Sequence, residues 1–226
     1  MITTVDFSPV WHYRQALFYG LCLTVLVSLA AIVVGTLMAI PLALGLRCRN
    51  RWVRAVFSII VEFVRACPPL VFLLWCHYLL PIAFGFRTSP ITTSLLVFTT
   101  YFAAFAADIF RGSLDAVNKD TLHAAIALGF SPILLLRRVQ IPEVFRRSLP
   151  ALNSLAVNLL KMSSLASIIA VPELMYSASL ILAERPRPFE VYSTIAAAYI
   201  AVIVPLVWLL RCWEKSRYGA LHPSQE

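Results

Sequence analysis

The chain has 226 residues, of which 60% are apolar and only 13% are charged, and its net charge is +8. A mean hydropathy of +0.82 excludes a soluble globular domain of ordinary composition. Because the basic residues cluster beside long apolar segments, the charge indicates orientation in a membrane rather than nucleic-acid binding.

The apolar segments predict membrane-spanning helices. They run far beyond the roughly ten residues of a barrel strand and do not alternate, and a chain in lipid must satisfy its backbone hydrogen bonds internally. Each segment reaches the roughly 20 residues that cross about 30 Å of hydrocarbon. Five spans are predicted, at about 17–46, 53–86, 91–110, 152–171 and 191–210.

The second span is interrupted at Pro68-Pro69. Prolines remove helical hydrogen bonds and kink or break a helix. The break either lines a cavity and acts as a hinge, or joins an interfacial helix to the true span, and the sequence leaves both alternatives open.

Lysine and arginine are distributed unevenly between the two sides of the membrane. The connections after spans one and three, together with the C-terminal tail, carry fourteen of them. The opposite side carries four, namely Arg14, Arg87, Arg185 and Arg187. The positive-inside rule therefore places the N-terminus outside and the C-terminus in the cytoplasm, as an odd number of spans requires.

Histidine and cysteine form no recognisable site. The four histidines and five cysteines are scattered along the chain, without the spacing of a metal site, a disulfide framework or a catalytic grouping. No metal ligand is expected, and an integral-membrane enzyme is disfavoured.

The cytoplasmic connection at 111–149 is the longest between spans and predicts helices of its own. Asp120 or Thr121 can cap a helix over 122–128, which Gly129 can end. A short apolar helix held outside the bilayer indicates a surface for a soluble partner.

The same connection predicts a second helix that leads back to the membrane. Ser131 and Pro132 supply an N-cap and a first-turn proline. Pro142 and Pro150 are expected to mark the return to the fourth span.

Lys161 lies about half way along the fourth span. A charge there costs about 3 kcal/mol unless it faces water or a partner. Asn158 and Ser164 stand three positions on either side and share its helical face. The group is either a polar stripe on a transport pathway or a snorkelling lysine beside ordinary helix–helix contacts.

Two pairs of opposite charges stand three residues apart near the cytoplasmic side. They are Asp108 with Arg111, and Glu62 with Arg65. Each pair either holds a helix end together or remains solvated.

The connection also carries His123-Ala124-Ala125, then Gly129, then Val139-x-Ile141-Pro142. This pattern resembles the Glu-Ala-Ala loop of binding-protein-dependent ABC importer permeases, Glu-Ala-Ala-x3-Gly-x9-Ile-x-Leu-Pro, and matches its spacing throughout. Two alanines give a slim helix that can enter a groove, and glycine lets the chain turn sharply.

The resemblance covers about 17–215 and points to the polar amino acid uptake subfamily. The further motifs that match, in the family's order, are Gly20-x3-Thr24, Arg65-Ala66-Cys67-Pro68-Pro69-Leu70-Val71, Asp108-Ile109-Phe110-Arg111-Gly112, Leu149-Pro150 with Asn153, and Lys161-Met162-Ser163-Ser164-Leu165.

Several positions depart from the family pattern. His123 stands where the family usually has Glu, Met162 replaces Asp, and Cys67 replaces Thr, while Asp120-Thr121 replaces Gly-Gln. The first change makes the docking helix less acidic, and the next two bear on the pathway and hence on the cargo.

The resemblance implies an all-α integral membrane protein with five transmembrane helices. The expected fold is the type I ABC importer transmembrane domain, similar to the methionine permease, with the N-terminus out and the C-terminus in. One domain is expected over 1–226, with its core at about 16–214 and a coupling segment at about 113–148.

The resemblance also implies a non-enzymatic permease subunit in the inner membrane of a bacterium, surrounded by lipid. Its expected partners are two ATPase subunits, a second permease subunit, identical or paralogous, and an extracytoplasmic solute-binding protein. This chain is expected to bind no cofactor, since ATP and Mg belong to the ATPases. The alternative is a secondary transporter or channel without an ATPase.

Site residues follow from these patterns and from the resemblance. Coupling to the ATPase is assigned to Asp120, Thr121, Leu122, His123, Ala124, Ala125, Gly129 and Pro142, the translocation pathway to Pro68, Asn158, Lys161, Ser163 and Ser164, and a structural ion pair to Asp108 and Arg111.

Overall fold

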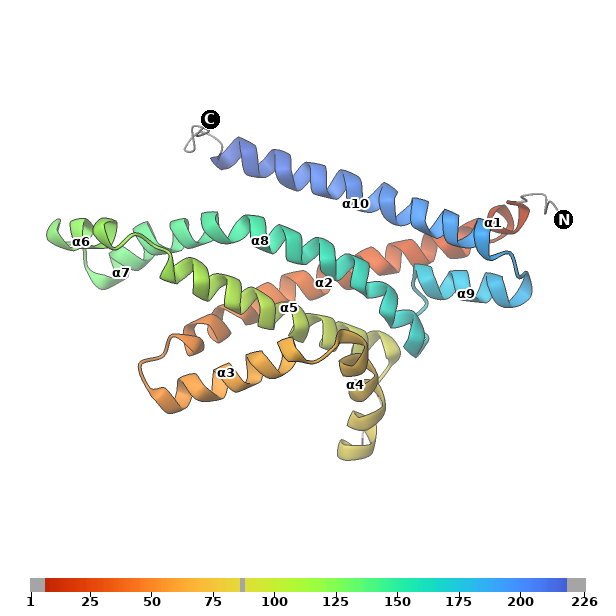
Figure 1. The fold of residues 1–226 in the computed structure, drawn as a ribbon, viewed down its shortest axis with the longest axis horizontal. Helices are drawn as coiled ribbons and strands as arrows, with labels where there is room; N and C mark the ends of the chain where they lie inside the picture. The colour runs from red at the N-terminus through yellow and green to blue at the C-terminus, as the bar shows by residue number, and fades with distance from the viewer. Residues whose placement is uncertain (1–6, 86–87, 219–226) are drawn as a thin grey trace.

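The structure is a computed structural model that describes residues 7–85 and 88–218, so Arg87 lies outside the described residues. Every regular element within these ranges is helical (Figure 1). The elements are α1 Ser8–His12, α2 Arg14–Leu46, α3 Arg51–Ala66, α4 Pro69–Phe84, α5 Pro90–Asp115, α6 Lys119–Ala127, α7 Pro132–Leu135, the π-helical turn η1 Leu136–Gln140, α8 Ile141–Met162, the 3-10 segment η2 Ser163–Ile169, α9 Leu174–Glu184 and α10 Pro188–Tyr218.

Four helical runs among the described residues are long and apolar enough to cross a membrane. They are Arg14–Leu46, Pro90–Asp115, Ile133–Ile169 and Pro188–Cys212. Helices α3 and α4 together pass the same test and make a fifth. The predicted all-helical membrane fold is confirmed, with the second span as a broken pair.

The broken pair bends by 106° between α3 and α4. Cys67 and Pro68 both have extended backbone angles, and Pro69 begins α4 without an N–H to donate. Two extended residues in succession turn the chain much further than a proline kink would, so α4 runs across the direction of the long helices (Figure 1).

The fourth span is longer than the sequence indicates. The continuous helical run begins at Ile133 and ends at Ile169. The expectation that Pro150 marks a boundary is wrong, because Pro150 lies inside α8. A proline removes one hydrogen bond, and here the buried residues Ser148, Leu149 and Leu159 pack before and after it.

The connection between the fourth and fifth spans is largely helical. Helix α9 fills most of it and packs between α2 and α10. Tyr13, just before α2, donates a hydrogen bond to Glu184 at the end of α9. This bond raises the pKa of Tyr13 above its ordinary value.

Helices α2 and α5 form the centre of the bundle and contact each other more extensively than any other pair. Their interface combines small and large side chains: Ala31, Ala39 and Ala43 of α2 are buried with Phe98 and Phe102 of α5. Lipid tails are as apolar as leucine, so close packing of this kind drives helix association in a membrane.

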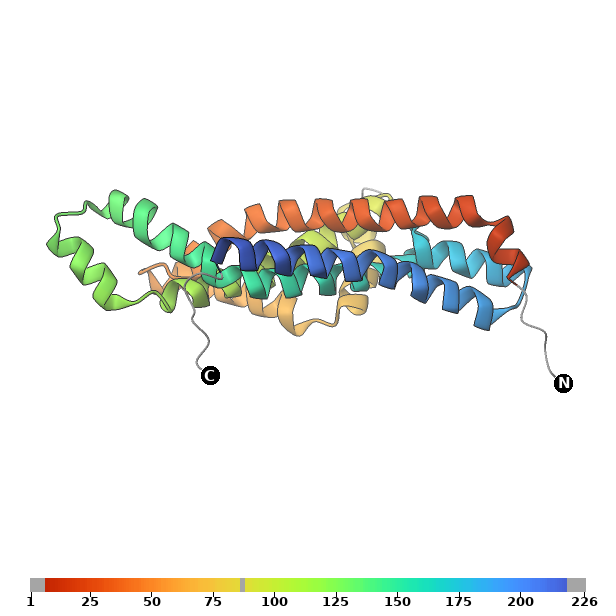
Figure 2. The same ribbon diagram turned by 90° about the horizontal axis from the view of Figure 1, so that it is seen from above.

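A second cluster joins α2, α9 and α10 at the end of the bundle that carries α1 (Figure 2). At its edge is Glu173, which is only 2% exposed. Its carboxylate accepts hydrogen bonds from Tyr176 N (2.9 Å), Thr24 Oγ1 (3.2 Å) and Tyr199 OH (3.3 Å). Because a buried carboxylate without partners is very costly, these donors tie three helices to one group.

Gly20 allows α2 to lie close to the start of α9. A Cβ at Gly20 would lie 2.8 Å from Ser177 Oγ and 2.9 Å from the carbonyl carbon of Glu173. We expect Gly20→Ala to lower the free energy of unfolding by about 1–3 kcal/mol through overpacking, measured as thermal unfolding of the purified protein in detergent. In the control Gly112→Ala, where a Cβ meets nothing within 4 Å, stability should hold or rise; equal losses in both variants would contradict the role of Gly20.

Candidate functional site

Helices α6 and α7 project from the end of the bundle opposite α1 and α9 (Figures 1 and 2). Helix α6 starts one turn earlier than the sequence predicts. Its cap is Asn118, whose side chain accepts a hydrogen bond from Asp120 N at 2.8 Å. The expectation of a cap at Asp120 or Thr121 is wrong, because both already lie inside the helix.

Gly129 follows the C-terminus of α6 with a φ of +81°. Phe130 N donates to Ala125 O (3.1 Å) and Gly129 N donates to Ile126 O (2.9 Å), which is the Schellman pattern of a helix end. A Cβ at Gly129 would meet nothing within 4 Å. Backbone conformation, and not lack of space, therefore selects glycine here.

The chain then returns toward the bundle through α7 and η1. Ser131 Oγ accepts from Leu134 N at 3.3 Å, as expected of an N-cap. The π-helical turn Leu136–Gln140 leads directly into α8, which has Pro142 in its first turn. No loop separates α7 from α8, so the segment is continuous with the fourth span.

The outer surface of this segment is apolar. Leu128 is 77% exposed, Ile133 is 78% exposed, and Ile126 of α6 is also exposed. We call these three residues the apolar tip. Exposed apolar residues that gather at a projection mark an interaction site, and the tip lies at the basic end, away from the spans.

The predicted coupling residues occupy several environments around the tip. Thr121 and Pro142 line one cavity of about 510 Å³ between the starts of α6 and α8. Among the remaining predicted residues, Ala125 is buried and Leu122 is half-buried, while Asp120, His123, Ala124 and Gly129 are exposed.

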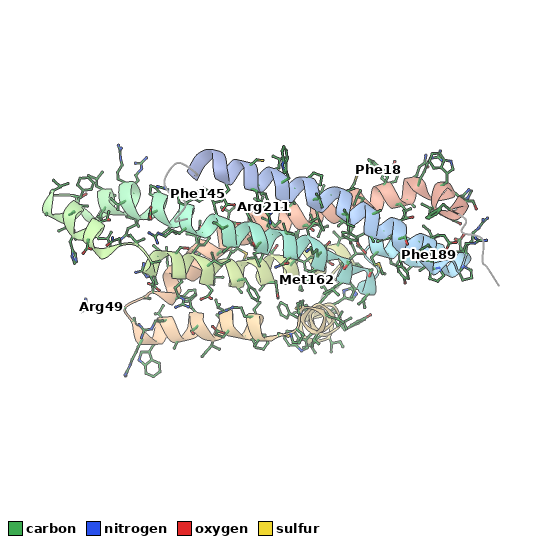
Figure 3. All side chains as sticks on the ribbon, turned by 45° about the horizontal axis from the view of Figure 1, so that its top comes forward. Phe18, Arg49, Phe145, Met162, Phe189 and Arg211 are labelled. Carbon is green, nitrogen blue, oxygen red and sulfur yellow. The ribbon has the colours of Figure 1, made fainter. Side chains whose placement is uncertain are left out.

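The predicted pathway residues gather only in part, between α8 and α10. Lys161 and Ser164 line a groove of about 440 Å³ together with Tyr199. Asn158 lines a neighbouring groove of about 380 Å³ with Asn153. Arg211 of α10 (Figure 3) and Glu214 also line the second groove, so polar and charged groups occupy this face.

Three other residues that the sequence analysis connected with the pathway, Ser163, Met162 and Pro68, do not line these grooves. Ser163 is buried and donates to Leu160 O at 2.7 Å. Met162, labelled in Figure 3, packs against the main core. Pro68 lies at the break between α3 and α4. Sequence spacing alone did not show which of the neighbouring residues 161–164 face the groove and which face the core.

Asn153 in the second groove is a pathway candidate that the sequence analysis did not assign. Its Nδ2 is buried and has no hydrogen-bond partner among the described residues. Unpaired buried donors are rare. The match of Asn153 to a family position was the signal that could have singled it out.

Asp108 and Arg111 pair at 2.6 Å, but they belong to a larger network. Arg65 of α3 contacts Asp108 at 3.3 Å and Glu62 at 3.0 Å, and its guanidinium lies over the Phe105 ring. The link between α3 and α5 was not predicted, because residues 43 positions apart give no local spacing signal.

Residues 31–216 match the family described as the binding-protein-dependent transport system inner membrane component. The chain belongs to this family. It is a membrane-spanning permease subunit of an ABC importer, as its sequence motifs predict.

Three similar proteins illustrate the relationship. The glutamine transport system permease protein GlnP of Escherichia coli strain K12 is 29% identical over 212 residues, covering 93% of this chain and 96% of GlnP. A crystal structure of an amino acid ABC transporter with histidines is 30% identical, with a TM-score of 0.88 and coverage of 95% of this chain and 100% of that chain.

The third similar protein supports the fold alone. An inward-facing structure of the MetNI methionine ABC transporter has a TM-score of 0.72 at 17% identity, covering 93% of this chain and 98% of that chain. The predicted type I importer permease fold, similar to the methionine permease, is confirmed.

The groove at Lys161 gives a test of the permease's polar face. We expect Lys161→Gln to reduce solute uptake at least about tenfold, since a charge-assisted hydrogen bond contributes about 1.5–3 kcal/mol, while the amount of inserted protein is unchanged. The measurement is radiolabelled uptake normalised to permease in the membrane. Lys161→Arg keeps the charge and should retain more uptake; unchanged uptake in Lys161→Gln would remove Lys161 from the pathway.

Proposed function

We propose that this permease carries a polar amino acid or a related small polar solute inward across a bacterial cytoplasmic membrane. The amino acid transporters among its similar proteins support the cargo class. The polar residues Asn158, Lys161 and Ser164, which line the grooves between α8 and α10, support a pathway on this face, completed by a second permease subunit, identical or paralogous. The whole chain acts as one domain, with its core at about 16–214.

The proposed complex has two further kinds of partner. Two ATPase subunits bind the coupling segment, at about 113–148, in the cytoplasm. A solute-binding protein delivers cargo to the opposite end, where α1 and α9 lie (Figure 1). The family description, a binding-protein-dependent transport system, supports this division. ATP and Mg belong to the ATPases, and this chain binds no cofactor.

The apolar tip is the observation that carries the coupling role. Leu128 and Ile133 are among the most exposed large apolar side chains described, and they lie in the projecting segment formed by α6, α7 and the turn between them (Figure 1). A groove on a soluble partner would bury them, and burial of each leucine or isoleucine side chain contributes about 1.5–3 kcal/mol.

The continuous helical run from Ile133 to Ile169 supports a mechanical role for the same segment. Ile133 stands at the apolar tip, and Lys161 stands on the groove at the far part of the run. Because a packed helix moves as a rigid body, displacement of the tip by an ATPase is transmitted along α8 to the groove. The groove would then open alternately to the two sides of the membrane.

Gly129 tests coupling separately from stability. A β-branched residue with positive φ is strained by about 1–2 kcal/mol, so Gly129→Val should misplace the tip. We expect normal membrane insertion but loss of ATP-dependent uptake, measured in proteoliposomes that contain the ATPase. Gly85→Val is the matched control, since Gly85 has a φ of +71° and equally open surroundings at the end of α4; it should keep uptake, and normal uptake by Gly129→Val would contradict the proposal.

Crosslinking tests contact with the ATPase. In a variant without native cysteines, Leu128→Cys should crosslink to an ATPase subunit in the assembled transporter, detected as a shifted band by electrophoresis. Leu180→Cys on α9, also exposed and at the opposite end, should not. Crosslinking of Leu180→Cys alone would reverse the proposed orientation, and ATP-independent transport would favour a secondary transporter.

A further inference from the structure

A cavity of about 360 Å³ at the basic end is lined by none of the residues assigned to coupling or to the pathway. It lies where α2 ends, α3 begins and α5 ends, close to the connection marked by Arg49 in Figure 3. Its lining residues include three arginines and two acidic residues, namely Arg51, Arg54, Arg111, Glu62 and Asp108.

The acidic residues of this cavity are already paired. Asp108 contacts Arg111 at 2.6 Å and Arg65 at 3.3 Å. Arg65 also contacts Glu62 at 3.0 Å. Two arginines therefore balance two carboxylates within the network.

Arg51 and Arg54 are left in excess. Neither has an acidic partner within 4.0 Å among the described residues; Arg51 lies over the Trp52 ring at 5.2 Å. Arg65 Nε, in the adjoining network, is buried and also has no hydrogen-bond partner among the residues described. The cavity thus offers two uncompensated positive charges beside an unused donor, which fits an anion.

An apolar stripe runs along α3 beside the cavity. Trp52, Val56, Ile59 and Phe63 recur at three- and four-residue spacing, so they share one face, and all are exposed, Trp52 by 70%. Four of the cavity-lining residues of α3, namely Arg51, Ala55, Ser58 and Glu62, precede the stripe residues by one position each, which places the two faces next to each other on the helix. The basic cavity and the apolar stripe therefore form one continuous surface along α3.

We propose that this cavity binds the phosphate of an anionic phospholipid of the cytoplasmic leaflet, with an acyl chain along the stripe of α3. Arginine forms bidentate hydrogen bonds with phosphate oxygens, and basic pockets between helices on the cytoplasmic side suit such headgroups. Two other anionic ligands fit less well. A free phosphate would leave the apolar stripe without a partner. An acidic protein segment would have to enter the headgroup region of the membrane to reach the cavity. The bound lipid would bridge α3 to α5 independently of the cargo.

The test uses the intact transporter, purified in detergent and incubated with phosphatidylglycerol, and native mass spectrometry measures the lipid retained. An arginine beside the bound anionic headgroup contributes about fivefold to binding of the lipid. We expect Arg51→Gln and Arg54→Gln each to lower retention about fivefold, and the double variant to lower it about thirtyfold. Phosphatidylcholine should be retained poorly by all of them.

Three comparisons make the result decisive. Arg49→Gln removes the same charge from the exposed connection outside the cavity, and this variant should retain as much lipid as the unmodified protein. Arg54→Lys keeps the positive charge and should lose less of the bound lipid than Arg54→Gln. Co-purification of the ATPase shows that each variant is assembled; if the double variant does not assemble, the two single variants decide. Equal retention in the Gln variants, displacement of the lipid by inorganic phosphate alone, or crosslinking of Trp52→Cys to a second permease would each overturn the proposal.

Discussion

Close packing between α2 and α5 is the constraint on which the rest of the structure depends. In lipid there is no hydrophobic gain from bringing two apolar helices together, so their association relies on shape. Gly35 shows how close the fit is, since a Cβ there would lie 3.0 Å from both the Phe102 ring and Thr99 O. Helices α3 and α8 pack against both members of this pair, whereas α10 packs on α8 and α9.

Polar groups fix the two ends of the bundle in different ways. At the end with α1, a single buried carboxylate, Glu173, gathers donors from α2, α9 and α10. At the basic end, Arg65 and Asp108 join α3 to α5, and Arg47 joins the end of α2 to Asp115 at 3.2 Å. The first arrangement surrounds a buried carboxyl group with uncharged hydrogen-bond donors, and the second pairs opposite charges; polar groups left without partners near hydrocarbon would be costly.

Between these fixed ends, a long helical run continues into the projection at the basic end. The run that starts at Ile133 connects the apolar tip to the groove at Lys161. The proposed coupling needs a stiff connection, and the direct passage from α7 through η1 into α8 supplies it. Two backbone hydrogen bonds hold the glycine turn at Gly129 in a defined geometry.

The sequence alone determined the membrane class, the approximate spans and the family, because hydropathy and motif spacing are local properties. It also located the Schellman turn at Gly129, since few residues adopt positive φ. It placed the N-cap of α6 at Asp120 or Thr121 instead of Asn118, and it treated Pro150 as a helix boundary although Pro150 lies inside α8. Packing against other helices decides where a helix begins and whether it continues through a proline, and local patterns do not contain that packing.

Only the tertiary structure decided which side chains meet. It turned Ser163 into the core while Lys161 and Ser164 line the groove, joined Arg65 to Asp108 across two helices, and gave the Pro68-Pro69 break its 106° bend. It also explained Gly20 and Thr24, which the sequence offered only as a motif, through their contacts with Glu173. These outcomes depend on residues far apart in the chain, and their distances are set by helix packing rather than by sequence spacing.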